Sequence, residues 1–303
     1  MLNGIINVYK EAGFTSHDVV AKLRGILKQK KIGHTGTLDP DATGVLPVCL
    51  GNGTRLCDML ADKSKEYVAV MRLGVVTDTQ DMSGQILQEK EVVCTEEEVQ
   101  AAILSFVGEY SQIPPMYSAL KVNGKKLYEL AREGKEIERQ PRQVFISEIE
   151  ILSMELPLVK FRVGCSKGTY IRTLCQDIGE KLGCGATMES LQRTRVGGFV
   201  LENALTLTEI EELTKAGTIL EKIMPADFVF SVLPKVLVKK EFRKRIDNGN
   251  YLLKKQMNVT EGVLTEEQGV QCRIYNDEGV FCGIYEYRAE DRQWKPVKMF
   301  PVM

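Results

Sequence analysis

The sequence predicts an α+β fold with a large first part and a small β-rich second part. Strand-like and helix-like segments alternate without the regular strand–helix–strand period of a parallel doubly wound sheet. The 303 residues, of which 44% are hydrophobic, are enough for one large core, or for one large and one small domain. After Pro234 the pattern changes to short strands separated by turns, so we expect domains over 1–233 and 234–303.

The chain up to residue 60 is predicted to form a strand, a helix, a loop and a second helix. Residues 4–10 are apolar enough for a strand, and Ser16-His17-Asp18 offers caps for a helix. One face of that helix carries the apolar side chains of Val19, Val20, Leu23, Ile26 and Leu27. Residues 33–53 are rich in Gly, Thr, Asp and Pro, which indicates a loop around the apolar run 45–48. Thr54 is a candidate cap for the second helix.

Further strands and helices follow from alternation and from end signals. The strands expected next cover residues 66–73, 85–88, 143–155 and 158–165. Thr95 and Glu98 form a capping box that begins one helix. Another helix carries Ile171 to Leu182 and ends at Gly183, a residue suited to the left-handed turn after a helix.

One segment in the first part looks inserted. Pro114-Pro115 interrupts the pattern, and residues 121–142 are highly charged. We therefore interpret residues 111–142 as an inserted loop and helix outside the core.

The charge of the chain is uneven along its length. The formal net charge is −1, yet residues 235–255 carry eight Lys or Arg side chains, and residues 1–31 carry six against two acidic ones. Basic islands of this kind bind phosphates when they face a nucleic acid backbone, and they also occur as solvated surfaces.

The cysteine pattern favours a reduced, cytoplasmic protein. The eight cysteines stand singly, without a Cys-x-x-Cys pair, so a zinc ribbon is not expected. Neither a signal peptide nor a run of about 20 apolar residues is recognisable, so we expect neither secretion nor a membrane span.

The segment Gly33-His34-Thr35-Gly36-Thr37-Leu38-Asp39-Pro40-Asp41-Ala42-Thr43-Gly44-Val45-Leu46-Pro47 places one carboxylate on a stiff, irregular loop. Pro40 fixes the backbone after Asp39 and disfavours a helical Asp39, while Gly36 and Gly44 allow unusual conformations. Taken alone, these residues also fit an ordinary Asp-Pro turn. A phosphate-binding P-loop is excluded because no Gly-Lys-Ser/Thr follows at the required spacing.

This segment resembles the catalytic motif of TruB-type pseudouridine synthases, in which the Asp of Gly-x-Leu-Asp-Pro carries the chemistry. The resemblance makes Asp39 that residue. Lys65-Glu66-Tyr67 resembles the motif whose tyrosine lies against the target base. Ser166 to Arg172 resembles the motif that supplies a pocket tyrosine, Tyr170, and an arginine paired with the aspartate, Arg172. Leu191 falls in a Leu-x-Arg segment whose leucine lines the uracil pocket.

The same resemblance implies further contacts with RNA. It assigns substrate-binding positions to Lys10, His34 and Asp81, and RNA-binding positions in the insertion to Lys121, Lys125 and Lys126. The matches run in order from about residue 4 to about residue 200. Near the first strand the chain has Tyr9-Lys10-Glu11 where the family usually has Asp-Lys-Pro, so only the lysine is kept.

The family also implies a fold, a reaction and partners. The expected catalytic domain has a mixed, largely antiparallel sheet flanked by helices and loops, followed by a PUA-like RNA-binding domain. The expected reaction isomerises the uridine at position 55, in the T-loop of tRNA, after base flipping. The product is an isomer, so no cofactor and no metal are expected. The expected partner is the T-arm and elbow of tRNA, and the protein is expected to be monomeric.

The sequence leaves the role of Asp39 open. A carboxylate beside C1′ acts as a nucleophile, stabilises an oxocarbenium-like state, or assists proton removal from the sugar. An arginine beside it, such as Arg172, would keep it ionised and lower its pKa.

Three other functions fit parts of the sequence. The first is an RNA-binding protein without catalysis, which would not need Asp39, Tyr67 and Arg172 together. The second is a pseudouridine synthase with another RNA target. The third is a glycoside-processing enzyme that uses Asp39 and Asp41, whose nearness in sequence does not establish facing carboxylates.

Overall fold

The computed structural model describes residues 1–122 and 124–300 of the chain. Within those residues, nine strands form one large sheet. They are β1 (Gly4–Lys10), β2 (Ile32–His34), β3 (Thr43–Leu50), β4 (Lys65–Leu73), β7 (Gly108–Gln112), β10 (Arg142–Glu155), β11 (Leu158–Cys165), β12 (Ala186–Val196) and β13 (Phe199–Val200).

The order of the strands across this sheet is β1-β3-β12-β4-β11-β10-β7, with β2 beside β3 and β13 beside β12. Neighbouring strands are antiparallel except β3 and β12, which run parallel where Gln192 and Arg193 meet Thr43 and Gly44. The predicted mixed, largely antiparallel sheet is confirmed.

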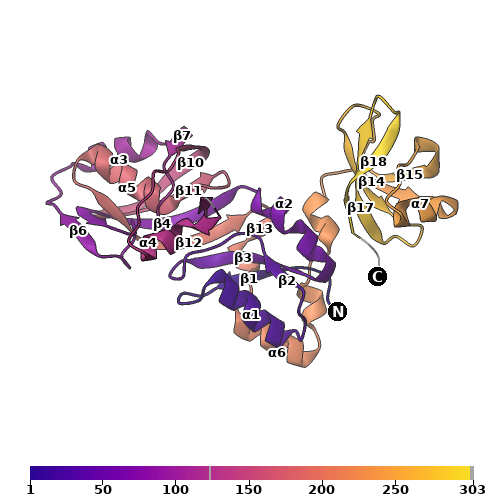
Figure 1. Ribbon diagram of the computed structural model, residues 1–303, viewed down its shortest axis with the longest axis horizontal. Helices are drawn as coiled ribbons and strands as arrows, with labels where there is room; N and C mark the ends of the chain where they lie inside the picture. The colour runs from indigo at the N-terminus through magenta and orange to yellow at the C-terminus, as the bar shows by residue number, and fades with distance from the viewer. Residues whose placement is uncertain (123, 301–303) are drawn as a thin grey trace.

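Helices cover the large sheet in two places, and each place has its own core. Helices α3 (Glu96–Leu104) and α5 (Ile171–Leu182) pack at one end, and α1 (Ser16–Ile26) and α6 (Leu207–Ala216) pack at the other (Figure 1). The remaining helices are short: α2 (Cys57–Ala61), α4 (Leu127–Arg132), α7 (Arg243–Asp247), and the 3-10 helices η1 (Gly51–Leu56), η2 (Leu201–Asn203), η3 (Ile219–Lys222), η4 (Ala226–Phe230), η5 (Lys240–Phe242) and η6 (Lys254–Gln256).

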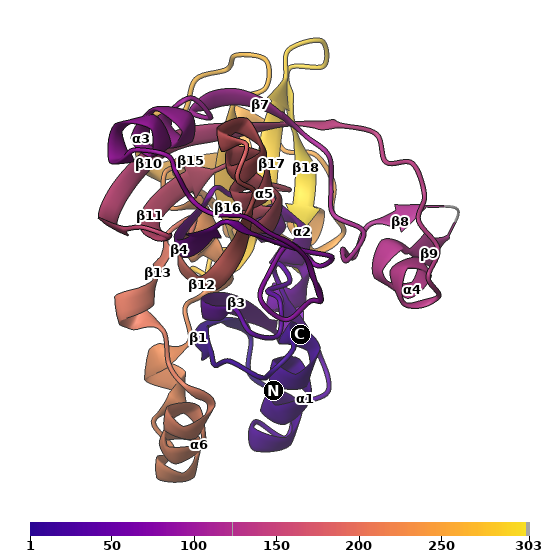
Figure 2. The same ribbon diagram turned by 90° about the vertical axis from the view of Figure 1, so that its left-hand side faces the viewer.

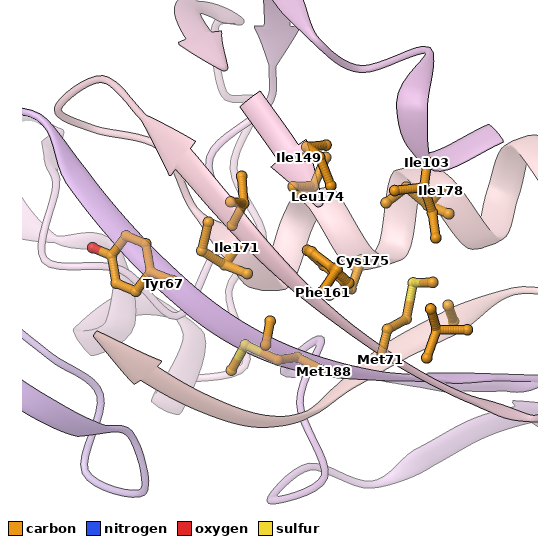
Figure 3. Packing of buried hydrophobic residues seen from close by; sticks show 14 of the residues in the cluster. Tyr67, Met71, Ile103, Ile149, Phe161, Ile171, Leu174, Cys175, Ile178 and Met188 are labelled. Atoms are coloured by element: carbon orange, nitrogen blue, oxygen red, sulfur yellow. The ribbon is translucent and has the colours of Figure 1, made fainter. Parts of the chain in front are cut away.

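The core beneath α3 and α5 extends to the region of Asp39. Phe161, Leu174 and Ile178 are fully buried in this cluster, which also contains Leu38 and Tyr67. Figure 3 shows Tyr67 at one end of the cluster, with its hydroxyl directed away from the other labelled side chains. The apolar cluster therefore ends at Tyr67, whose hydroxyl points out of the cluster.

Two small hairpins stand apart from the large sheet. The first pairs β5 (Val75–Thr77) with β6 (Ile86–Glu89), and the second pairs β8 (Lys121–Val122) with β9 (Lys125–Lys126). The second hairpin and α4 lie between β7 and β10 and project to one side of the molecule in Figure 2. The middle of the predicted insertion therefore lies outside the large sheet, whereas Ser111 and Gln112 at its predicted start belong to β7 and Arg142 at its end belongs to β10.

The C-terminal part has its own sheet, made of β14 (Lys235–Val238), β15 (Met257–Glu261), β16 (Gln271–Tyr275), β17 (Phe281–Arg288) and β18 (Gln293–Met299). Its strand order is β15-β14-β16-β17-β18. Trp294 and Tyr285 are buried in its own core, while Phe281 and Phe300 pack against Phe230 of the preceding segment. The predicted small β-rich part is confirmed, and the boundary at residues 233 and 234 stays a prediction.

Most of the elements predicted from sequence are present. The cap of α1 is Thr15 rather than one of Ser16 to Asp18, and Asp18 closes its capping box. The capping box at Thr95 and the left-handed Gly183 after α5 are found as expected.

Two predictions about elements were wrong, and one strand was not predicted. Residues 45–48, expected within a loop, lie in the buried strand β3, because β1, β2 and β12 surround that strand. Thr54 caps no helix; it lies inside η1, and its hydroxyl donates to the carbonyl of Gly51 at 2.8 Å. The strand β12 was not predicted, since its alternation of polar and apolar residues is irregular and two bulges interrupt its pairing with β4.

Candidate active site

The loop between β2 and β3 carries Asp39 and is fixed at both sides of that residue. Leu38 and Ala42 are each 3% exposed and pack into the core beneath α5. The backbone N–H of Leu38 donates to the hydroxyl of Ser16 on α1 at 3.0 Å. The N–H of Ala42 donates to the carbonyl of Asp39 at 3.2 Å, which closes a turn around the carboxylate. The loop is therefore stiff, as Pro40 and the glycines indicated.

Gly44, at the end of the Asp39 loop, has a backbone conformation and a close neighbour that only glycine accommodates. Its φ is +108°, and a Cβ at this position would lie 2.2 Å from the carbonyl oxygen of Arg193 on β12. A side chain here would force β3 away from β12 and move the end of the Asp39 loop with it.

Arg172, in the first turn of α5, binds the carboxylate of Asp39 with two nitrogens. Its Nε lies 3.0 Å from Asp39 Oδ2, and its Nη2 donates to Asp39 Oδ1 at 3.2 Å. Nη1 donates to the carbonyl of Thr79 at 3.0 Å and lies 3.5 Å from Asp81 Oδ2, while Nη2 also donates to the carbonyl of Tyr117 at 2.8 Å. The buried guanidinium thus joins the Asp39 loop, the β5–β6 turn and the beginning of the insertion.

The environment of Asp39 changes its acidity in two opposing ways. Burial raises the pKa of the carboxyl above its ordinary value, and Arg172 acts in the opposite direction without cancelling the rise. The sequence-based expectation of a lowered pKa was therefore wrong, because it counted the charge of the arginine and not the loss of water. Since 38% of the side-chain surface of Asp39 stays accessible, solvent still reaches the carboxylate and limits the rise.

Tyr67 lies on β4 opposite Arg193 on β12, and it is 8% exposed. Burial raises the pKa of its phenol, and the neighbouring charge of Asp39 acts in the same direction. Arg193 opposes this rise and donates from Nε to the carbonyl of Val45 at 2.7 Å and from Nη2 to that of Gly36 at 3.3 Å. One buried arginine therefore holds the Asp39 loop and contacts Tyr67.

Tyr170 and Leu191 come from two parts of the chain near Tyr67, the start of α5 and the neighbouring strand β12. Tyr170 is the residue before α5, half-buried, and burial raises the pKa of its phenol. Leu191 is on β12, directly opposite Ala69 of β4, and packs against the core beneath α5. The structure therefore brings both residues to the part of the sheet that carries Tyr67.

Asp81 lies in the turn between β5 and β6 and turns one oxygen toward Arg172. Its Oδ1 accepts from the hydroxyl of Thr79 at 2.7 Å and from the N–H of Ser83 at 3.1 Å, which leaves Oδ2 for the guanidinium. Two carboxylates therefore share one arginine.

Lys10 is placed behind the Asp39 loop rather than on its surface. Its side chain is fully buried, and its ammonium donates to the carbonyls of Glu11, Pro40 and Ala42 at 3.0, 2.8 and 2.6 Å. Burial lowers the pKa of Lys10 to about 8, and the nearby charges of Asp41 and Asp39 oppose this effect. With these carbonyls as partners, Lys10 holds the loop, and a direct contact with substrate stays only a prediction of the resemblance.

The environment of His34, at the end of β2, disfavours its protonated form. Burial lowers the pKa of its imidazole, and His17 of α1, whose ring centre is 5.1 Å away edge-to-face, acts in the same direction. Nδ1 accepts a hydrogen bond from the N–H of Gly36 at 3.3 Å, so the proton resides on Nε2. No sequence pattern indicated that the two histidines would meet, because they lie on a helix and a strand.

The lysines assigned to RNA lie on the projecting hairpin. Lys125 is exposed and lies 3.5 Å from Glu133. Lys126 donates to the hydroxyl of Tyr128 at 3.1 Å and lies over its ring, together with Arg132. The side chain of Lys121 lies outside the described residues. The structure separates these lysines from the Asp39 loop and joins the two regions through the Tyr117 carbonyl bound by Arg172.

Sequence reasoning missed two buried side chains at this site, Gln112 and Arg193. Gln112 bonds the backbone of Tyr170 on both sides, and nothing in its sequence position before Pro114-Pro115 indicated such a contact. Arg193 stood within the Leu-x-Arg segment, so its position was noticed but its burial beneath the loop was not.

Comparisons with known proteins show the family of the chain. The profile described as "TruB family pseudouridylate synthase (N terminal domain)" matches residues 24–171, and that described as "tRNA pseudouridylate synthase B C-terminal domain" matches residues 172–231. A tRNA pseudouridine synthase B from Lachnoclostridium phytofermentans is 56% identical over 99% of this chain and 100% of the relative. One from Alkaliphilus oremlandii is 46% identical over 100% of this chain and 99% of the relative.

Solved structures with the same fold were also found. One is an H/ACA ribonucleoprotein bound to a substrate RNA that contains 2′-deoxyuridine, with a TM-score of 0.73 and 28% identity over 99% of this chain and 85% of that one. Another is a Cbf5–Nop10–Gar1 complex, with a TM-score of 0.73 and 30% identity over 99% of this chain and 87% of that one.

Proposed function

The chain belongs to the TruB family of pseudouridylate synthases, and from that premise we propose that it acts on the uridine at position 55, in the T-loop of tRNA. As a tRNA pseudouridine synthase it is an isomerase: the bond from C1′ to N1 of the uracil breaks, and a bond from C1′ to C5 forms. The choice of position 55 rests on the resemblance of the chain from residue 4 to residue 200, including the insertion.

The observation that carries the proposal is the carboxylate of Asp39 held by the fork of Arg172 at 3.0 and 3.2 Å beside the buried Tyr67. We assign Asp39 to C1′, as nucleophile or as the negative charge that stabilises an oxocarbenium-like state. Arg172 keeps the carboxylate in one orientation before the sugar arrives, which is the condition for a reactive contact near 3 Å.

The target base must leave its stack to reach this carboxylate. Unstacking costs a few kcal/mol, and an aromatic platform in the pocket offsets part of that cost. We propose that Tyr67 supplies the platform, worth about 1–3 kcal/mol per base, and that Tyr170 and Leu191 cover the other faces. The three side chains come from β4, from the residue before α5 and from β12, which lie side by side.

The rest of the RNA is held outside this pocket. His34 offers a neutral Nε2–H beside the Asp39 loop, and the hairpin β8–β9 with α4 offers Lys125, Lys126 and Arg132 to phosphates. One structural relative is described with a bound substrate RNA, which supports RNA binding by this fold. We propose that a monomer acts on the T-arm and elbow.

The test is to map pseudouridine in a tRNA transcript before and after treatment with the purified protein. Chemical labelling of pseudouridine followed by primer extension should show one new site, at position 55. A transcript with cytidine at position 55 is the matched control and should acquire no label.

Two outcomes would contradict the proposal in different ways. Label at another uridine alone would keep the enzyme class and reject the T-loop target. RNA binding without any new label, in a protein preparation that is folded, would support an RNA-binding protein without catalysis.

A further inference from the structure

Gln112 is a buried side chain near the site that the reaction described above does not use. It is 1% exposed and is the last residue of β7, at the edge of the large sheet. The chain leaves the sheet after Gln112, and the Cα partner of Gln112 across the sheet is Arg142, where the chain returns. Gln112 therefore lies at the base of the insertion.

The amide of Gln112 binds the backbone of Tyr170 with both of its polar atoms. Its Oε1 accepts from the N–H of Tyr170 at 2.8 Å, and its Nε2 donates to the carbonyl of Tyr170 at 2.9 Å. The N–H of Tyr170, the residue before α5, has no partner within the helix, and Gln112 satisfies this backbone donor. This pair of hydrogen bonds imitates one step of a β-ladder between a strand and the start of a helix.

A second contact between the same two elements supports this one. Tyr110, two residues earlier on β7, donates its hydroxyl to the carboxylate of Asp177 on α5, and Gln112 Nε2 lies 3.4 Å from the same hydroxyl. The strand is thus attached to α5 at its beginning and two turns later. Since both attachments are at least partly buried, sliding of α5 along β7 would break hydrogen bonds that water does not fully replace.

The residues placed by this attachment are the ones that meet the substrate. Tyr170 is the bonded residue, and Arg172 follows it in the first turn of α5. Arg172 in turn binds the carboxylate of Asp39. It also binds the carbonyl of Tyr117, which lies in the segment that follows Gln112. We infer that Gln112 is a positioning residue for pseudouridine formation, which fixes the start of α5 and thereby the Tyr170 ring and the Arg172–Asp39 pair.

This inference rests on the proposed function for the target uridine and for the roles of Tyr170, Arg172 and Asp39. A misplacement of about 1 Å in a reacting geometry lowers a rate by about 10²-fold, so the loss should appear in kcat rather than in RNA binding. We expect Gln112→Met to lower kcat about 10- to 100-fold and to change KM for tRNA by less than about threefold.

Gln112→Glu provides a readout that a purely structural role would not move. The ionised glutamate accepts from the Tyr170 N–H but has no proton for the Tyr170 carbonyl, whereas the protonated form has one. Since burial between strand and helix favours the protonated form, kcat of Gln112→Glu relative to wild type should rise at least about fivefold from pH 8 to pH 6. The relative kcat of Gln112→Met should stay low across that range.

Gln29 offers a matched control. It is also buried, and its amide also binds one backbone on both sides, accepting from Leu2 N–H at 2.7 Å and donating to Leu2 C=O at 3.0 Å. It lies at the far end of α1, away from Asp39, so Gln29→Glu should lower the melting temperature and leave kcat unchanged.

The experiment measures kcat, KM and melting temperature for the wild type and the three variants on the same tRNA transcript. The inference is overturned if Gln112→Met keeps kcat within about threefold of wild type, including the case in which only its KM for tRNA rises. Should the wild type modify a uridine other than position 55, the proposed target fails, and the same comparison at that uridine still decides the role of Gln112.

Discussion

At the scale of single residues, the site depends on how Arg172 distributes its N–H groups. Its partners are Asp39, Asp81 and the carbonyls of Thr79 and Tyr117. A planar fork reaches these partners in fixed directions, while an ammonium has the same charge without the directions. The arginine therefore matters for aim as well as for charge.

Asp39→Asn should abolish turnover and leave the fold intact. The amide has the shape of the carboxylate but cannot attack C1′ or carry the compensating charge, so the loss should exceed the 10²–10⁴-fold typical of one acid–base group. The melting temperature should stay within about 3 °C of wild type, because the loss of the Arg172 pairing and the relief of a buried charge oppose each other. Single-turnover formation of pseudouridine and thermal unfolding are the measurements.

Asp41→Asn is the matched control for that variant. Asp41 lies on the same loop and is exposed. We expect its activity to remain within about threefold of wild type, since its carboxylate is not bound by Arg172. Equal losses in both variants would favour a pair of working carboxylates, and activity of Asp39→Asn within about tenfold of wild type would remove Asp39 from the chemistry.

Arg172→Lys should impair turnover more than binding. The positive charge remains, but one ammonium cannot reach both oxygens of Asp39 and both carbonyls, so kcat should fall by at least about tenfold at a nearly unchanged Kd for tRNA. Arg273→Lys is the control, because Arg273 is also buried and also binds a carbonyl and a carboxylate, Leu233 and Glu261, within the C-terminal sheet. Equal kcat losses in the two variants would mean that Arg172 acts only on stability.

At the scale of elements, the inserted hairpin β8–β9 and α4 together form a charged projection, called the arm below, with a buried leucine where it joins the rest of the protein. Leu127 is this leucine, while Tyr128 lies between the charges of Lys126 and Arg132. An aromatic ring held by two cations suits contact with an RNA backbone and an unstacked base together.

Neutralising the arm should weaken tRNA binding and flatten its salt dependence. Replacement of Lys121, Lys125 and Lys126 by Gln should lower the slope of log K against log salt by about one unit for each phosphate that the arm no longer binds. Turnover at saturating tRNA should change little, because Asp39 and its pocket lie elsewhere. Filter binding at several salt concentrations measures both the affinity and the slope.

Three lysines outside the arm provide the comparison for this variant. Lys215 is on α6, Lys222 is on η3 and Lys28 follows α1, and all three are exposed. In Figure 2, α1 and α6 lie at the bottom of the molecule, away from the arm. Their replacement by Gln makes the same change in net charge and should leave the slope unchanged. An unchanged slope for the arm variant would show that its charges are only a solvated surface.

At the scale of the whole molecule, segments far apart in the chain meet around Asp39. From the first turn of α5, Arg172 binds the loop after β2, the turn after β5 and the start of the insertion. In Figure 1 the C-terminal sheet lies apart from this region, next to α2 and the N-terminal strands. No helix in residues 1–122 and 124–300 is long and apolar enough to cross a membrane.

The reaction should need neither a metal nor a nucleotide. It rearranges bonds within one nucleotide, so it requires no redox carrier and no activated phosphate. Pseudouridine formation in excess EDTA, without added nucleotide, should keep its full rate on a T-arm stem-loop. The RNA stem-loop is the suitable substrate because a full tRNA needs magnesium for its own folding. A rate that is restored only by added metal would point to a different chemistry.

The sequence by itself determined much of the local structure and, through the family resemblance, singled out Asp39 as the candidate catalytic residue. The capping box of α3, the strand β4 and the glycine after α5 follow from short-range rules that act within a few residues. The stiff loop around Asp39 follows in the same way, because Pro40 and Gly44 restrict and allow backbone angles wherever they occur.

Only the tertiary structure decided the contacts that give these residues their properties. Asp39 and Arg172 are 133 positions apart, and the rise in the pKa of Asp39 comes from enclosure by several segments. The buried strands β3 and β12, the meeting of His17 with His34 and the bonds of Gln112 to Tyr170 likewise join distant parts of the chain. Burial and pairing across such separations depend on how the whole chain packs, so no local pattern records them.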